Sequence, residues 1–95
     1  YVIQRLRALQ DKHAIIGDVR GNGMFFAVDM VSDRTSRAPA GAATKRVVNG
    51  MRDRGVLISR IGIHDNILKI RPPMPFSREH ADVLVGTLDD VLAGL

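Results

Sequence analysis

Apolar residues recur at two different spacings along the 95-residue chain, and these spacings predict its elements. Spacing of three and four gives a helix one apolar face, and it predicts helices at residues 1–13, 42–54 and 77–95. The last of these is the clearest, because its apolar stripe is continuous. Short runs rich in β-branched and aromatic residues predict strands at residues 15–20, 24–31, 56–59 and 66–71.

The element order is therefore α-β-β-α-β-β-α, in one domain over residues 1–95. The chain is thus predicted to be α/β in the broad sense and α+β in the narrower one. Its short connections favour a mainly antiparallel, four-stranded sheet with helices packed mainly on one face. Residues 24–31 are apolar on both strand faces, which predicts a central strand covered on both sides. Asp29 is the exception and needs a partner or an exposed position. Gly50, inside the second helix, indicates close packing there.

The segments between these elements contain turn and cap signals. Gly21, Asn22 and Gly23 are typical of a hairpin turn. They do not form a dinucleotide fingerprint, because Phe26 stands at the third glycine position and a strand follows. Residues 32–41 are predicted to be a solvated loop, and residues 60–66 another. His13 is expected to interact with the last carbonyls of the first helix.

Composition narrows the possible chemistry. The net charge of +4 permits an anionic partner, although the basic residues are scattered. No cysteine is present, which excludes disulfides and favours a cytoplasmic location. No apolar run could span a membrane, and the histidines lack metal-ligand spacing. The chain begins at Tyr1 without a signal peptide or a methionine, so we expect a processed product or a piece of a larger protein.

One stretch, NILKIRPPMPFS at residues 66–77, combines cations with a rigid corner. Pro72 and Pro73 end the strand because neither has an N–H to donate. Ser77 is a helix cap, followed by an acidic first turn. The corner lies just beyond two cations, Lys69 and Arg71. It is either a sharp strand-to-helix connection or the support for a cation at an anion site.

Three blocks in register resemble one family: IIGDVRGNGMFFAVDMV (15–31), MRDRGVLIS (51–59) and NILKIRPPMPFSREHADVLVGTLDDVL (66–92). Together they resemble the C-terminal small domain of class III aminotransferases, which are fold type I enzymes that use pyridoxal 5'-phosphate. Within that family the chain is most similar to the branch of alanine–glyoxylate aminotransferase 2-like proteins and phospholyases that act on phosphorylated amines. The resemblance covers essentially the whole chain.

The resemblance implies where the substrate would be bound. Many members of the family carry an arginine, two residues before an alanine and the double proline, that binds the substrate carboxylate. Lys69 stands at that arginine position here, and Arg71 at the alanine position. A lysine is a point charge that suits a phosphate, whereas an arginine fork suits a carboxylate. Lys69 and Arg71 are therefore the candidate substrate-binding residues.

The resemblance also implies what this chain does not contain. The family's Schiff-base lysine and its cofactor contacts lie upstream, so no catalytic, cofactor-binding or metal residue is predicted here. Pyridoxal phosphate is expected in the full-length enzyme and not in this chain alone, which we expect to be inactive by itself. The implied partners are the large domain of the same polypeptide and an amine or amino acid substrate. The full-length protein is expected to be a homodimer, with no nucleic acid or membrane partner.

The predicted function is amino-group transfer between an amine or amino acid and a keto acid, with this chain contributing anion binding and active-site closure. The first alternative is a phospholyase that uses the same cofactor. The second, of another class, is a free-standing basic αβ module that binds RNA. Such modules read bases with exposed aromatic residues, which are scarce here.

Overall fold

The computed structural model describes residues 2–22, 25–56, 58–71 and 77–95. Its helices are α1 (Val2–Lys12), α2 (Gly41–Asp53) and α3 (Arg78–Ala93). Its strands are β1 (Ile16–Asn22), β2 (Phe25–Asp33), β3 (Ala38–Pro39), β4 (Ser59–Ile61) and β5 (Ile67–Ile70). The predicted turn at residues 21–23 lies partly outside the described residues, and the proline corner at residues 72–73 lies entirely outside them.

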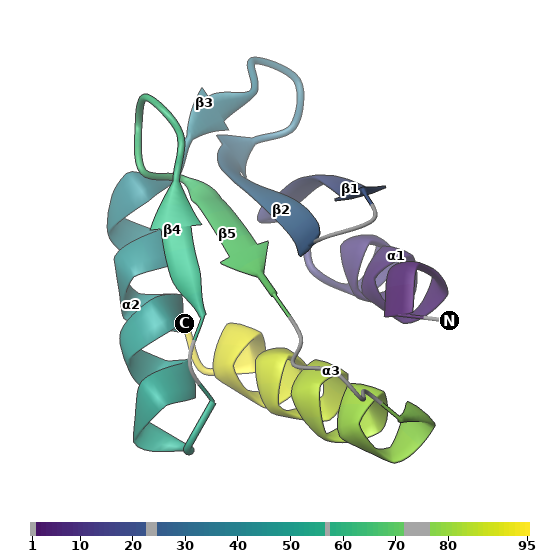
Figure 1. The fold of residues 1–95 in the computed structure, drawn as a ribbon. Helices are drawn as coiled ribbons and strands as arrows, with labels where there is room; N and C mark the ends of the chain where they lie inside the picture. The colour runs from purple at the N-terminus through teal and green to yellow at the C-terminus, as the bar shows by residue number, and fades with distance from the viewer. Residues whose placement is uncertain (1, 23–24, 57, 72–76) are drawn as a thin grey trace.

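The strands form one antiparallel sheet in the order β1-β2-β5-β4, with β3 paired to the end of β2 (Figure 1). β2 is central, as its apolar sequence predicted. The predicted α+β class, with a mainly antiparallel sheet, is confirmed. β3 was not predicted, because two residues inside a polar loop leave no periodic signal.

The core lies between one face of the sheet and the helices. The strand residues on this face are almost fully buried: Val19, Val28, Met30, Leu68 and Ile70. α1 lies beside β1 and α2 beside β4, and α3 contacts both helices (Figure 1). The apolar stripe of α3 is buried as predicted, and Ser77 caps this helix by accepting a hydrogen bond from the His80 backbone N–H. No helix in the described residues has both the length and the apolar character needed to cross a membrane.

The strand predicted at residues 56–59 overlaps the observed strand only at Ser59, and Leu57 lies outside the described residues. β4 instead covers Ser59–Ile61, of which Arg60 and Ile61 were predicted to be loop. Its register with β5 is set by the tight turn that follows, where Gly62 and Asp65 both have positive φ. The apolar run was misleading because Val56 and Ile58 pack against the core as connecting residues.

Two smaller predictions concern α1 and α2. A Cβ on Gly50 would lie 3.0 Å from Val91 Cγ1, so the close packing predicted at this glycine is confirmed.

The carbonyls at the end of α1 are bound by Arg34, whose Nε donates to Ala14 O and whose Nη2 donates to His13 O, both at 3.1 Å. Arg34 was assigned to a solvated loop. It ties that loop to the end of the helix.

Candidate functional site

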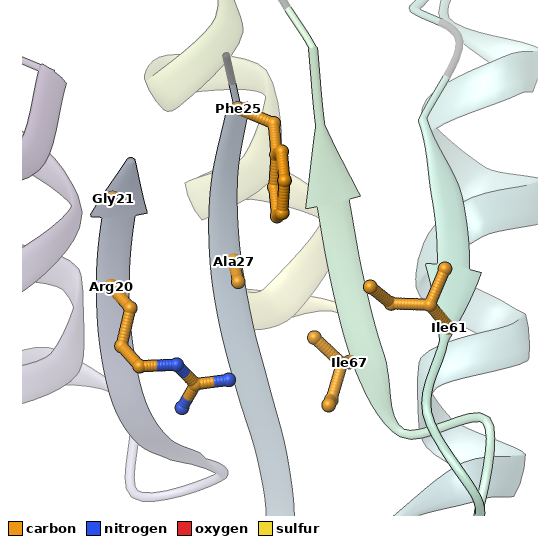
Figure 2. Close-up of a pocket in the computed structure, with 6 residues that line it drawn as sticks. All are labelled: Arg20, Gly21, Phe25, Ala27, Ile61 and Ile67. Atoms are coloured by element: carbon orange, nitrogen blue, oxygen red, sulfur yellow. The ribbon is translucent and has the colours of Figure 1, made fainter. Parts of the chain in front are cut away.

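The sheet has a second face, which we call the open face. It carries Asp18, Arg20, Phe25, Ala27, Asp29, Ile61, Ile67 and Lys69. The helices lie behind the sheet when this face is viewed (Figure 2). The prediction that β2 is covered on both sides is therefore not met within the described residues, because helices cover only its core face. The open face is therefore a surface that a ligand or another part of a longer polypeptide can contact.

A groove of about 330 Å³ runs over the open face (Figure 2). Its lining residues are Arg20, Gly21, Phe25, Ala27, Ile61 and Ile67. Ala27 forms a shallow floor because its side chain is small, while larger side chains stand on both sides of it. A mostly apolar groove with few polar groups is the usual composition of a binding site.

The polar wall of the groove is an ion-pair network. Arg20 makes a two-point contact with Asp29, at 2.6 Å from Nη1 to Oδ2 and 2.9 Å from Nη2 to Oδ1. Its Nη1 also lies 3.0 Å from Asp18 Oδ2. Arg37 Nη2 stands 3.8 Å from Asp29 Oδ2. The contacts with Asp29, and then with Asp18, raise the pKa of Arg20 above its ordinary value.

This network explains how β2 tolerates a carboxylate. Asp18 and Asp29 face each other across the β1–β2 ladder, and two like charges in that position repel. Arg20 offsets the repulsion by binding both. The predicted need of Asp29 for a partner is confirmed, but the partner was not identified from sequence. Alternation along β1 places Asp18 and Arg20 on one face, and that was the available signal.

Lys69 lies on the open face, half-buried, in the middle of β5. It stands opposite Ala27, and its Nζ lies 4.9 Å from the centroid of the Phe25 ring. Arg71 follows the end of β5 and is exposed. The structure therefore brings Lys69 to the groove region and places Arg71 just beyond the end of the strand. The substrate-binding residues predicted from the sequence did not include Phe25.

Residues 1–92 match the model of one protein family, aminotransferase class III. This match spans nearly all of the chain. The chain belongs to the class III aminotransferase family. That assignment favours the enzyme hypothesis over a free-standing RNA-binding module, and it agrees with the resemblance carried by the three sequence blocks.

Individual relatives of this class III aminotransferase chain belong to two kinds of enzyme. It is 43% identical, over 94% of its length, to alanine–glyoxylate aminotransferase 2 homolog 2, a mitochondrial protein of Arabidopsis thaliana. A phospholyase from Arthrobacter, solved in complex with phosphoethanolamine, is 50% identical over the whole chain with a TM-score of 0.93. A PLP-bound amine transaminase from an uncultivated Pseudomonas species is 31% identical over 98% of the chain, with a TM-score of 0.87. The chain spans 19%, 22% and 21% of these three proteins, about a fifth of each.

Membership of the class III aminotransferase family implies pyridoxal phosphate in the full-length enzyme, and the open face can be tested for a fit. Among the described residues that line the groove there is no lysine, and the one arginine of that lining is already bound to two carboxylates. The residues around the groove therefore do not form a site for the cofactor by themselves. The part of the chain that the structure describes also contains no cluster of three or more side chains that could hold a metal ion.

Proposed function

We propose that this chain is the C-terminal small domain of a pyridoxal-phosphate-dependent enzyme that transfers amino groups, and that its open face borders the substrate site. The observation that carries this proposal is the position of Lys69. Its ammonium lies on the one sheet face that the helices leave uncovered, beside an apolar groove. The cofactor, when bound, supplies the electron sink for chemistry at the amine carbon. This chain supplies binding and closure.

The rest of the polypeptide is the proposed partner of the open face. The apolar residues of the groove would stay in contact with water in the chain alone, whereas β2 has the sequence of a strand covered on both sides. Relatives of this chain are about five times longer. A large domain that packs over the groove would cover the apolar residues and exclude water from around Lys69.

Lys69 would bind the anionic group of the substrate. The carboxylates that share its face are held by Arg20, so the positive charge of Lys69 is not neutralised by them. An ammonium donates hydrogen bonds in three directions and suits a phosphate or a carboxylate at the distal end of an amine. Arg71, exposed at the end of the same strand, would add positive charge to the approach.

Phosphate elimination from a phosphorylated amine is the second candidate function. A point charge at position 69 favours a phosphate over a planar carboxylate. The 50% identity to a phospholyase that was solved with phosphoethanolamine supports the same reading. Both candidate functions use the same cofactor and the same contact with the substrate anion. They are distinguished by the product that each reaction releases.

The experiment uses the full-length enzyme that carries this chain, with Lys69→Ala compared against Lys45→Ala. Lys45 is exposed on α2, away from the open face, and controls for the loss of a positive charge. Phosphoethanolamine is supplied as substrate, and release of phosphate is measured beside amino transfer to glyoxylate. Losing a charged hydrogen bond should raise KM for phosphoethanolamine about ten- to a hundredfold in the Lys69 variant.

The Lys45 variant should keep the KM of the unmodified enzyme. An unchanged KM in the Lys69 variant would show that this residue does not bind the substrate anion. Release of phosphate without amino transfer would identify the phospholyase candidate, and amino transfer without phosphate release would identify the transaminase. The cytoplasmic location stays a prediction.

A further inference from the structure

The ammonium of Lys69 has an aromatic ring as its neighbour. We propose that Phe25 is a positioning residue, whose ring holds the Lys69 ammonium at the groove while leaving its charge available to an anion. The proposal rests on the proposed function of Lys69 in substrate binding, and it adds a second residue from a different strand. Phe25 touches Lys69 and is not itself assigned to the substrate.

The sheet register places the two residues as diagonal neighbours. Lys69 pairs with Ala27 across the β2–β5 ladder, and Phe25 stands two residues before Ala27 on the same face. Diagonal neighbours on a sheet are within reach of aromatic and long side chains. The Phe25 ring lies over the sheet between β2 and β5 (Figure 2), and Nζ of Lys69 is 4.9 Å from its centroid. This distance is within the range of a cation–π contact.

Ala27 makes the contact sterically possible. It lies directly opposite Lys69 and two residues from Phe25 on the same strand face, and its side chain is a single methyl group that is almost fully buried. A longer side chain at this position would stand between the ring and the lysine stem. The groove floor and the lysine position therefore depend on the same small residue.

An aromatic ring and a carboxylate beside Lys69 differ in how much positive charge they leave for a ligand to bind. An ion pair would cancel the charge of Lys69, whereas the ring attracts the ammonium through its quadrupole and carries no net charge. The two carboxylates described on the open face, Asp18 and Asp29, are bound to Arg20. Within the part of the chain that the structure describes, Lys69 makes no ion pair. The ammonium is thus oriented and still positive.

Orientation matters for a lysine because its stem has four rotatable bonds. Ordering such a side chain when a ligand binds costs conformational entropy, and a preformed contact removes part of that cost. The ring would therefore lower Kd and KM for an anionic substrate. It would leave kcat nearly unchanged, because the contact is equally present before and during the reaction.

The test uses the full-length holoenzyme and two measurements: Kd for inorganic phosphate by calorimetry, and KM and kcat for phosphoethanolamine. Phe25→Leu removes the ring at similar size, and we expect Kd and KM to rise about two- to fivefold with little change in kcat. Phe25→Tyr keeps the ring and should restore the binding of the unmodified enzyme. A loss of binding in Phe25→Tyr as large as in Phe25→Leu would overturn the proposal.

Replacing Phe25 by phenylalanines with one, two or three ring fluorines gives a series that keeps the shape of the side chain. Each fluorine withdraws charge from the ring face, so Kd for phosphate should rise in steps along the series. This series also serves if Phe25→Leu does not fold. A Kd that stays constant across the fluorinated rings would overturn the proposal.

The Lys69→Ala background separates this proposal from the one it rests on. Phe25→Leu should have no further effect on Kd in that background, because the ring acts through the lysine. An equal effect in both backgrounds would show that Phe25 acts independently, which contradicts positioning. If Lys69→Ala weakens phosphate binding and Phe25→Leu does not, only the positioning role fails. If Lys69→Ala itself has no effect, the proposed function fails.

Discussion

Two glycines in this chain have opposite steric surroundings. A Cβ built on Gly17 would lie 2.8 Å and 2.9 Å from the two γ-methyl groups of Val31. Val31 is buried and β-branched, so its side chain has little freedom to move away. At Gly86, in the interior of α3, no atom of the described residues lies within 4 Å of the same position, apart from the chain neighbours of the glycine and the backbone of its own helix. The sequence alone does not distinguish these two glycines.

Substitution by alanine should therefore change stability in opposite directions. Gly17→Ala should lower the free energy of unfolding by about 1–3 kcal/mol, because the added methyl overpacks a buried contact. Gly86→Ala should raise it by up to about 1 kcal/mol, because alanine is the better helix former and meets no obstacle. Urea unfolding of both variants measures the two changes. Equal effects in both variants would contradict the steric account.

At the scale of elements, α1 and α3 are joined by a three-residue clamp. Asp89 of α3 accepts a hydrogen bond from Lys12 Nζ at 2.8 Å, and its other oxygen lies 2.7 Å from Nε2 of His13. His13 was predicted to interact with the carbonyls at its own helix end, and its ring contacts α3 instead. The hydrogen bonds from Lys12, and then from His13, hold the pKa of Asp89 below its ordinary value of 3.8.

The clamp predicts a loss of stability in acid. Because the folded-state pKa of Asp89 is lower than its unfolded value, the stabilisation is present above pH 3.8 and is lost as pH falls through the folded-state pKa. Asp89→Asn should lower the free energy of unfolding at pH 7 and reduce its decline as the pH falls below the ordinary aspartate value of 3.8. Urea unfolding at several pH values measures both effects.

Asp90→Asn is the matched control for the clamp. It removes the same charge from the adjacent, exposed position of α3 and leaves the contacts of Asp89 in place. This variant should keep the steep acid decline of the unmodified protein. Parallel pH profiles for Asp89→Asn and the unmodified protein would show that the clamp does not contribute to stability.

The local sequence pattern was sufficient to predict most of the helices and strands. The stripe of α3, the Ser77 cap and the central position of β2 follow from spacing and residue type, which act within one element. The network of Arg20 and the contact of Lys69 with Phe25 depend on strand register, which joins residues far apart in the chain. Lys69 itself was predicted as part of the site, while Phe25 was predicted only as part of the strand at residues 24–31.

At the scale of the whole molecule, the open face remains uncovered by the described helices. Ile61 and Ile67 are paired across the β4–β5 ladder and line the groove while only partly buried. The chain spans about a fifth of the relatives that it matches. If the remainder of a longer polypeptide packs on the open face, these side chains will be buried there. Ile63, in the β4–β5 turn, is 97% exposed and is not one of the described residues that line the groove.

Thiol labelling can test this arrangement, since the chain has no cysteine of its own. Ile67→Cys and Ile63→Cys are introduced separately into the full-length protein, and the labelled peptides are followed by mass spectrometry. The thiol at position 67 should react at least about tenfold more slowly than the one at position 63, because the rate follows access to solvent. Mild denaturant that separates the domains should remove the difference. Equal rates in the native protein would show that the groove faces solvent, and that the large domain does not pack on the open face.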